Sequence, residues 1–201
     1  MGLCAHTECK QLGIFLEDFY VATFMIFKKT TCRALSVTFL VLAGFSLPAV
    51  SDIQVKFTES APKDRFSFSN LSKCQINALK ISIDLSESSG QLIFDTTSTG
   101  AGVEVFQPFE VLKGNIDLIS AVSDGDNKLV ISIDSINAEE TVSFTIDVDD
   151  TLTQSELGKI RVTGSEIQGG KVAITVQDET PMSAVFGDDS STLIKMSNCD
   201  K

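Results

Sequence analysis

Residues 141–151, with the sequence TVSFTIDVDDT, decide the fold class of this protein. In an extended strand, successive side chains point to opposite faces. Phe144, Ile146 and Val148 therefore share one face. The opposite face carries Ser143, Thr145, Asp147 and Asp149. The stretch predicts a strand that packs one face against an apolar core and presents carboxylates to water on the other.

The same alternation recurs on both sides of this stretch, in short segments separated by glycine and by Asp or Asn turns. After residue 51 we find no sustained helical period. About ten such strands predict an all-β fold, an antiparallel β-sandwich of the immunoglobulin-like or jelly-roll-like type, over residues 52–201. The expected strands are residues 53–57, 66–70, 80–85, 92–97, 103–112, 128–136, 141–151, 159–162, 171–176 and two short runs within 183–197.

The first 51 residues differ in composition from the rest. Residues 25–51 have a basic start, an apolar run from about residue 34 to residue 47, and a small-x-small cleavage site at residues 49–51. This pattern predicts an N-terminal secretory signal peptide that is removed before Asp52. The apolar run is shorter than the roughly 20 residues of a spanning helix, so we expect no permanent membrane span after cleavage. Residues 1–24 would make the leader unusually long, so we expect an over-extended start and translation from Met25.

Removal of the leader leaves Cys74 and Cys199 out of five cysteines. In an oxidising compartment we expect these two residues to form one disulfide, with two unpaired thiols as the alternative. The leader also contains His6 and Tyr20, the single histidine and the single tyrosine, and the chain has no tryptophan. Histidine-dependent nucleophilic catalysis and histidine zinc sites are therefore excluded for the mature protein.

The charge of the chain narrows the class of partner. The formal net charge is -11, and the isoelectric point is about 4.5. Nucleic acids and anionic lipids need a basic surface that neutralises phosphates, so we expect neither as a partner. Cations and cationic surfaces fit this charge better.

Residues 103–112, VEVFQPFEVL, predict an edge strand or a bulged strand, because Pro108 has no N–H to donate to a ladder. Phe106 and Pro108 lie on the nominal outer face of this strand, and we consider them a candidate partner-binding surface. In the alternative, a neighbouring loop of the same chain covers Phe106. Glu104 and Glu110 lie about 20 Å apart along a straight strand, farther than the roughly 5–10 Å between glycosidase carboxylates. We find no other catalytic spacing, so we expect a protein that is not an enzyme.

The acidic face of the first stretch is the candidate metal site. Asp147 and Asp149 lie about 7 Å apart on one strand face, and Asp150 follows them. Ca²⁺ takes about six to eight oxygen ligands, so further carboxylates from turns are expected to join the site. The turn candidates are Asp124, Asp126 and Asp95. In the alternative, Lys159 and Arg161 have the same spacing on the next predicted strand and form cross-strand ion pairs with the two aspartates.

Four separated blocks resemble the aggregation factor core protein family, which is named after the core of the sponge aggregation factor and has similar predicted proteins in bacteria. The blocks are APKDRFSFSN (61–70), LIFDTTSTGAGVEVFQPFEV (92–111), FTIDVDDT (144–151) and VTGSEIQGG (162–170). The resemblance implies an extracellular β-sandwich module that assembles with copies of itself, within a calcium-dependent adhesion system in the sponges.

These observations together predict a secreted, extracellular or periplasmic module for adhesion or self-assembly. Its expected partners are copies of itself or cell-surface components, and its expected cofactor is Ca²⁺. The alternative is an extracellular carbohydrate-binding module. Sugar sites commonly use tryptophan or tyrosine platforms, which the mature chain lacks, and Phe106 would be the stacking residue in their place.

Overall fold

The computed structural model describes residues 51–99, 102, 106–154, 157 and 161–196, and this part of the chain is built from β-strands. The strands are β1 (Ser51–Thr58), β2 (Asp64–Asn70), β3 (Ile76–Asp84), β4 (Ile93–Asp95), β5 (Glu110–Lys113), β6 (Ile116–Leu118), β7 (Lys128–Ile136), β8 (Thr141–Asp149), β9 (Lys171–Val176), β10 (Met182–Val185) and β11 (Ser191–Met196). A short 3₁₀ helix, η1 (Gly164–Ile167), precedes β9.

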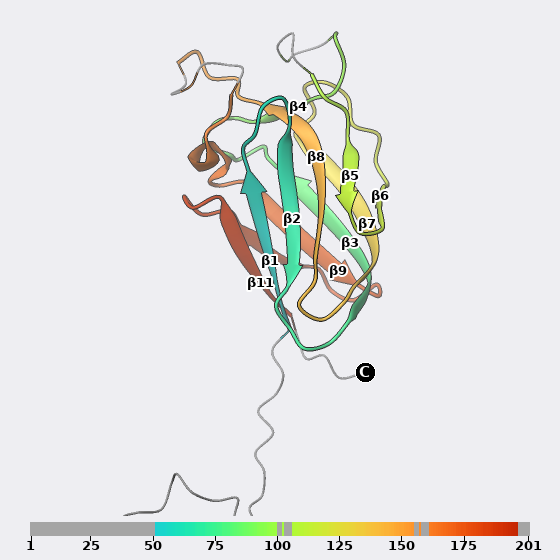
Figure 1. Ribbon diagram of the computed structural model, residues 1–201. Coiled ribbons are helices and arrows are strands. Elements are labelled where there is room, and N and C mark those ends of the chain that lie inside the picture. Colours follow the sequence, from blue (N-terminus) through green and yellow to red (C-terminus); the bar gives the residue numbers. More distant parts are fainter. Residues whose placement is uncertain (1–50, 100–101, 103–105, 155–156, 158–160, 197–201) are drawn as a thin grey trace, which may run out of the picture. The chain divides into compact units, whose positions relative to one another are not determined.

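All strand pairs are antiparallel, and they form two sheets that pack face to face (Figure 1). One sheet has the order β11-β1-β2-β8-β4, with β5 also paired to β8; the other has the order β10-β9-β3-β7-β6. This arrangement confirms the predicted all-β sandwich. The expected signal peptide falls almost entirely on residues 1–50, outside the described residues. In the described part, no helix has the length and apolar character needed to cross a membrane.

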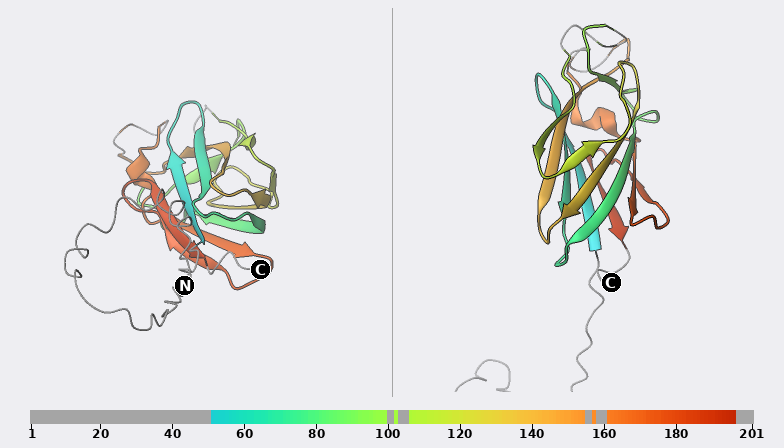
Figure 2. Two further views of the ribbon diagram at one scale, coloured as in Figure 1. Left: turned by 60° about the horizontal axis from the view of Figure 1, so that its bottom comes forward. Right: turned by 90° about the vertical axis from the view of Figure 1, so that its right-hand side faces the viewer.

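The core lies between the two sheets, and Phe144 of β8 is at its centre. Phe144 is fully buried and stands opposite Phe66 of β2 in the ladder. Its ring centroid lies 5.3 Å from that of Phe66, 6.1 Å from that of Phe68 and 4.8 Å from that of Phe109. The facing sheet contributes isoleucines from β3 and β7, such as Ile81 and its ladder partner Ile131. Figure 2 shows the two layers from the side.

The region expected as a strand over residues 103–112 is shorter in the structure. Residues 106–109 are irregular, β5 begins at Glu110, and residues 103–105 lie outside the described part. Pro108 supplies no ladder donor, which explains the late start. The edge and bulge predictions are confirmed for β5: it pairs with β8 at the side of the sheet, and its register shifts between Val111 and Lys113. The short strand β6 was not predicted from the sequence.

The strand expected over residues 159–162 is wrong for its described part. Arg161 and Val162 are irregular, and residues 158–160 lie outside the described residues. Val162 is nevertheless buried, as the alternation predicted. Arg161 is not part of a strand, so it cannot form the expected cross-strand ion pair with an acid of β8. Lys159, the other residue expected to pair, lies outside the described part.

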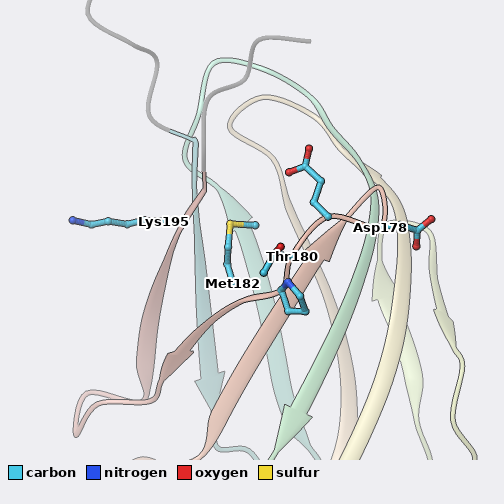
Figure 3. Close-up of a pocket in the computed structure, with 6 residues that line it drawn as sticks. Asp178, Thr180, Met182 and Lys195 are labelled. Atoms are coloured by element: carbon cyan, nitrogen blue, oxygen red, sulfur yellow. The ribbon is translucent and has the colours of Figure 1, made fainter.

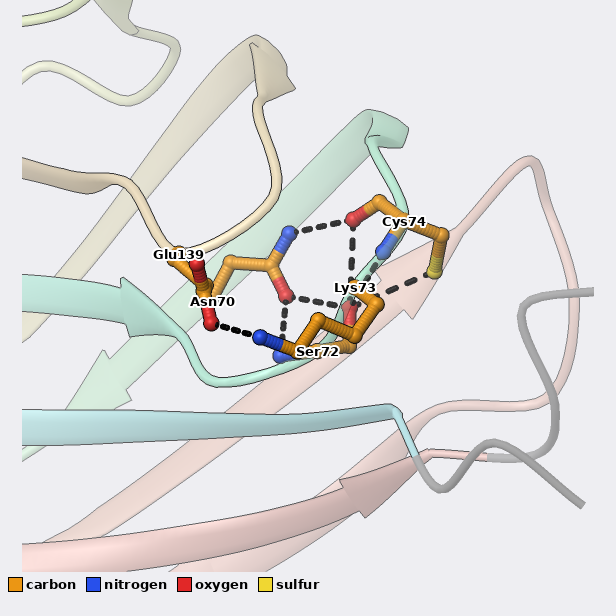
Figure 4. Close-up of polar contacts among 5 residues, drawn as sticks. All are labelled: Asn70, Ser72, Lys73, Cys74 and Glu139. Atoms are coloured by element: carbon orange, nitrogen blue, oxygen red, sulfur yellow. Dashed lines mark hydrogen bonds and ion pairs between the residues drawn. The ribbon is translucent and has the colours of Figure 1, made fainter. Parts of the chain in front are cut away.

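A polar network holds together the end of the sandwich where β2 ends (Figure 4). The Nδ2 amide of buried Asn70 donates to the carbonyls of Cys74 (2.7 Å), Ile136 (3.1 Å) and Asn137 (3.0 Å). The Oδ1 atom of Asn70 accepts from the backbone N–H of Ser72 at 3.0 Å and from its hydroxyl at 2.6 Å. The network ties the β2–β3 turn to the end of β7. It places Cys74 at this end, but Cys199 lies outside the described residues, so the disulfide stays a prediction.

Candidate functional site

Four carboxylates from three adjacent strands meet where β8 ends, and we call Asp64, Asp95, Asp147 and Asp149 the acidic cluster. Asp95 of β4 stands directly opposite Asp147 of β8, and Asp149 lies two residues farther along the same face. Asp64 begins β2 on the other side of β8, and its Oδ2 accepts from the backbone N–H of Val148 at 3.1 Å. The pairing of β8 with β2 and β4 therefore brings together acids that are far apart in the sequence.

All four side chains of the acidic cluster are buried, with exposed fractions of 1% to 6%. The expectation that Asp147 and Asp149 face water is therefore wrong. Part of the cover comes from Gly102, whose backbone lies so close to the Asp95 carboxylate that an added Cβ would overlap it. On the same side, the backbone N–H of Asp147 donates to the carbonyl of Gln107 at 3.1 Å. Because neighbouring segments cover this outer face, strand alternation alone does not report its exposure.

A pocket of about 240 Å³ opens beside the acidic cluster and reaches two of its members, Asp64 and Asp147. The rest of its lining comes from the β1–β2 turn, residues 59–62, and from Arg161 and Val162. Asp147 Oδ2 is buried and accepts no hydrogen bond from any described residue. Arg161 is exposed, and within the described residues it forms no ion pair with Asp64 or Asp147.

The cluster raises the pKa of two of its carboxyl groups. Burial raises the pKa of Asp147 to about 8, and the negative charges of Asp149, Asp64 and Asp95 add to the increase. Burial also raises the pKa of Asp64 to about 7, against hydrogen bonds from Ser60 and Val148 that favour its charged form. These two carboxyl groups therefore hold their protons more tightly than exposed aspartates do.

The remaining predicted metal ligands, Asp124, Asp126 and Asp150, have hydrogen-bonding roles in turns. The Asp124 carboxylate accepts from the backbone N–H and hydroxyl groups of Thr96 and Thr97, which holds the pKa of Asp124 below its usual range. Asp126 accepts from the backbone N–H of Ser123 at 2.7 Å, and Asp150 accepts from that of Leu152 at 3.0 Å.

These contacts distinguish the three residues from one another. Asp124 and Asp126 lie next to β4 in the fold, because Asp124 binds Thr96 and the carbonyl of Asp126 accepts from the N–H of Phe94. Their carboxylates stabilise the turns there. Asp150 is buried, directly follows β8, and keeps its Oδ2 without a hydrogen bond from the described residues.

Sequence reasoning missed Asp64, although the sequence contains a signal for it. Asp64, Phe66 and Phe68 occupy alternate positions, so the pattern places the acid on the same face as two core phenylalanines. Ionised side chains are rarely buried unless they are paired or coordinate a metal. An acid at an inward position of a strand therefore indicates a special environment before the fold is known.

The cluster supplies oxygen donors, which suit hard cations such as Ca²⁺. In the described part of the chain, no group of three or more acidic, histidine or cysteine side chains is already arranged to hold a metal ion. Cation binding would therefore require the carboxylates to rotate toward one point.

The residues expected to bind a partner lie beside the cluster, on the chain segment that leads into β5. Pro108 is exposed, whereas Phe106 is half-buried. The next phenylalanine, Phe109, turns inward onto Phe144. Of the two predicted anchors, Pro108 is thus fully available at the surface and Phe106 is available in part.

A second hollow, of about 700 Å³, lies at the turn between β9 and β10 (Figure 3). Met182 is half-buried, and the other lining residues are exposed: Asp178, Glu179, Thr180, Pro181 and Lys195. Figure 3 shows the Lys195 side chain directed away from the other labelled residues. This hollow lacks the buried polar groups of the acidic cluster, so the cluster is the stronger candidate site.

Comparison of the chain with models of known protein families and with curated proteins found no match.

Proposed function

We propose that this protein is a secreted, non-enzymatic module that associates with copies of itself through the open edges of its β-sandwich. The observation that carries the proposal is the presence of large exposed apolar side chains on strands at both sides of the sandwich. The resemblance to the aggregation factor core family supports the same function, since those proteins are self-assembling extracellular modules.

The first of these sides is formed by β5 and β6, and we call it the β5–β6 edge. β5 ends one sheet beside β8, and β6 ends the other sheet beside β7. Leu112 of β5 is 45% exposed, Leu118 of β6 is 36% exposed, and Ile119 just after β6 is 53% exposed. Exposed apolar side chains on short edge strands favour contact with another chain, because an edge also offers unpaired backbone groups.

The opposite side is formed by β10 and β11, which end the two sheets there (Figure 1). Val185 of β10 is 56% exposed, and Leu193 of β11 is 42% exposed. A molecule with two different adhesive edges forms head-to-tail contacts, and such contacts build rings or open chains rather than closed dimers. Strand addition at an edge is a general mode of such contacts.

Sedimentation velocity over a range of protein concentrations tests this function. We expect the protein to form species larger than a monomer as its concentration rises. The double variant Leu118→Lys with Ile119→Lys should remain monomeric, because it places two charges on the β5–β6 edge. A matched control is Leu71→Lys, since Leu71 is 52% exposed but lies between β2 and β3, away from both edges. A wild-type protein that stays monomeric at about 100 μM would refute the proposal.

A further inference from the structure

We propose that the outer face of the six-stranded sheet binds an anionic polysaccharide, one whose sugars carry carboxylate or sulfate groups. We call this surface the basic face, and its cations are Lys56 of β1, Arg65 of β2 and Lys113 of β5. The sheet that carries the basic face lies in front in Figure 1. The proposal goes beyond self-association, which uses apolar side chains at the edges of the sandwich.

The strand register brings the three cations to one area of the sheet. Lys113 stands opposite Ser143 of β8, and Lys56 stands opposite Ser67 of β2. Ser143 and Ser67 are themselves ladder partners, so the four residues form one row across the sheet. With strands about 4.8 Å apart, the backbones of the two lysines lie about 14 Å apart. Arg65 lies two residues before Ser67 on the same face, and it is a diagonal neighbour of Lys56 at about 7–8 Å.

The three cations are available to an external anion. All three are exposed, and within the described residues none of them forms an ion pair. The acids at outward positions of these strands already have basic neighbours: Glu110 forms an ion pair with Lys63, and Asp52 stands opposite Lys195.

Two further acids lie in loops beside the basic face. The charge of Lys56 reaches Asp189, and the charge of Lys113 reaches Glu140. The carboxylate of Asp189 accepts hydrogen bonds from Ser191, and that of Glu140 accepts them from Asn137. Neither acid is ion-paired with its lysine in the described part of the chain, so both lysines can still contact a ligand.

The basic face differs in charge from the rest of the molecule. The whole chain has a net charge of -11. The outer face of the five-stranded sheet carries as many acids as bases, namely Asp84, Asp117, Asp134, Lys80, Lys128 and Lys171. Two of these, Lys128 and Asp84, form an ion pair. A group of unpaired cations on an otherwise acidic protein attracts an anion to that one place.

The other side chains of the basic face select the class of anion. Hydroxyl and amide groups, which exchange hydrogen bonds with sugar hydroxyls, lie at the outward positions Gln54, Ser67, Ser69 and Thr141. Among the described residues of these strands, no aromatic side chain points outward, and the exposed leucines Leu112 and Leu193 lie at the two borders, on β5 and β11. Protein interfaces are centred on aromatic and apolar anchors, so a protein partner fits this face less well. A nucleic acid has one charge per about 1.7 Å and needs a denser row of cations.

Fluorescence anisotropy with labelled oligosaccharides, titrated with the purified protein, tests the basic face. A heparin octasaccharide presents sulfate groups, an oligogalacturonide of the same length presents carboxylates, and a neutral malto-oligosaccharide is the control. At least one of the two acidic oligosaccharides should bind, and the stronger of them identifies the preferred group. The neutral one should not bind. Raising NaCl from about 50 to about 300 mM should weaken binding, because salt screens exposed charges.

Variants connect the binding to this face. Lys56→Gln with Arg65→Gln should weaken binding about fivefold or more, because two of the three cations are lost. The matched control, Lys80→Gln with Lys171→Gln, makes the same change of charge on the outer face of the other sheet and should keep wild-type affinity. All four residues are exposed, so both variants should fold, and far-ultraviolet circular dichroism checks this.

The two proposals can fail separately. In sedimentation velocity, Lys56→Gln with Arg65→Gln should associate like the wild type, because it leaves both apolar edges intact. The polysaccharide proposal would be overturned if neither acidic oligosaccharide bound or if the two double variants lost affinity equally. Tighter binding of poly-glutamate than of both oligosaccharides would also overturn it, because it would indicate an acidic protein as the partner.

Discussion

The substitution Asp147→Asn gives the most direct test of the electrostatics at the end of β8. The carboxyl group of Asp147 has a pKa of about 8, against an ordinary value of 3.8. A folded-state pKa above the unfolded value means that the folded protein holds the proton more tightly. The resulting contribution to stability is fully present below about pH 4 and is lost as the pH rises to about 8. The amide that the substitution introduces does not titrate, so the variant should avoid this loss.

The size of the effect follows from the shift. Each pKa unit corresponds to about 1.4 kcal/mol, so a shift of about four units sets an upper bound of about 6 kcal/mol on the loss between pH 4 and pH 9. The neighbouring acids titrate together with Asp147, and water enters the pocket beside it, so we expect about 1–2 kcal/mol. Asp147→Asn should therefore differ little from the wild type at pH 5, where only a small part of the contribution is lost, and exceed its stability by about 1–2 kcal/mol at pH 9.

Urea unfolding followed by far-ultraviolet circular dichroism, at pH 5, 7 and 9 with EDTA, measures these differences. Asp189→Asn is a matched control, because Asp189 is exposed and its carboxylate accepts hydrogen bonds from Ser191, which lower its pKa. A lowered pKa contributes stability above the unfolded value, so the control should show no gain at high pH. If Asp147→Asn is less stable than the wild type at pH 9 in EDTA, mutual repulsion does not dominate the cluster and the reasoning fails.

Three further predictions concern stability. Phe144→Ala should lower the free energy of unfolding in a urea titration by about 3–5 kcal/mol, because it removes a fully buried ring that contacts three other rings. Phe106→Ala is the control: Phe106 is half-buried, so this variant should cost no more than about 1.5 kcal/mol. Asn70→Ala should cost about 2–3 kcal/mol, because three carbonyls lose their donor; wild-type stability would show that water replaces the amide. If Cys74 and Cys199 form the expected disulfide, Cys74→Ser should lower the free energy of unfolding by about 2–4 kcal/mol. Mass spectrometry of the non-reduced wild-type protein checks the bond, and the detection of two free thiols would contradict it.

Much of the fold could be predicted from the sequence because strand periodicity is a local property. The alternation in residues 141–151 places Phe144, Ile146 and Val148 on the core face, and the structure buries all three. Most other alternating segments also became strands at nearly the expected positions. The local pattern failed where the chain is irregular, as around Pro108 and Arg161, because a few alternating residues do not form a strand without a partner strand.

The sequence by itself determined that β8 has an apolar face and an acidic face, because the direction of each side chain follows from its position in the strand. Only the tertiary structure decided what covers the acidic face and which acids meet there. Asp64 and Asp95 reach Asp147 through pairing of β8 with strands that are distant in the chain. Burial and charge density depend on those neighbours, and they change an expected solvent-facing pair of aspartates into a buried cluster with raised pKa values.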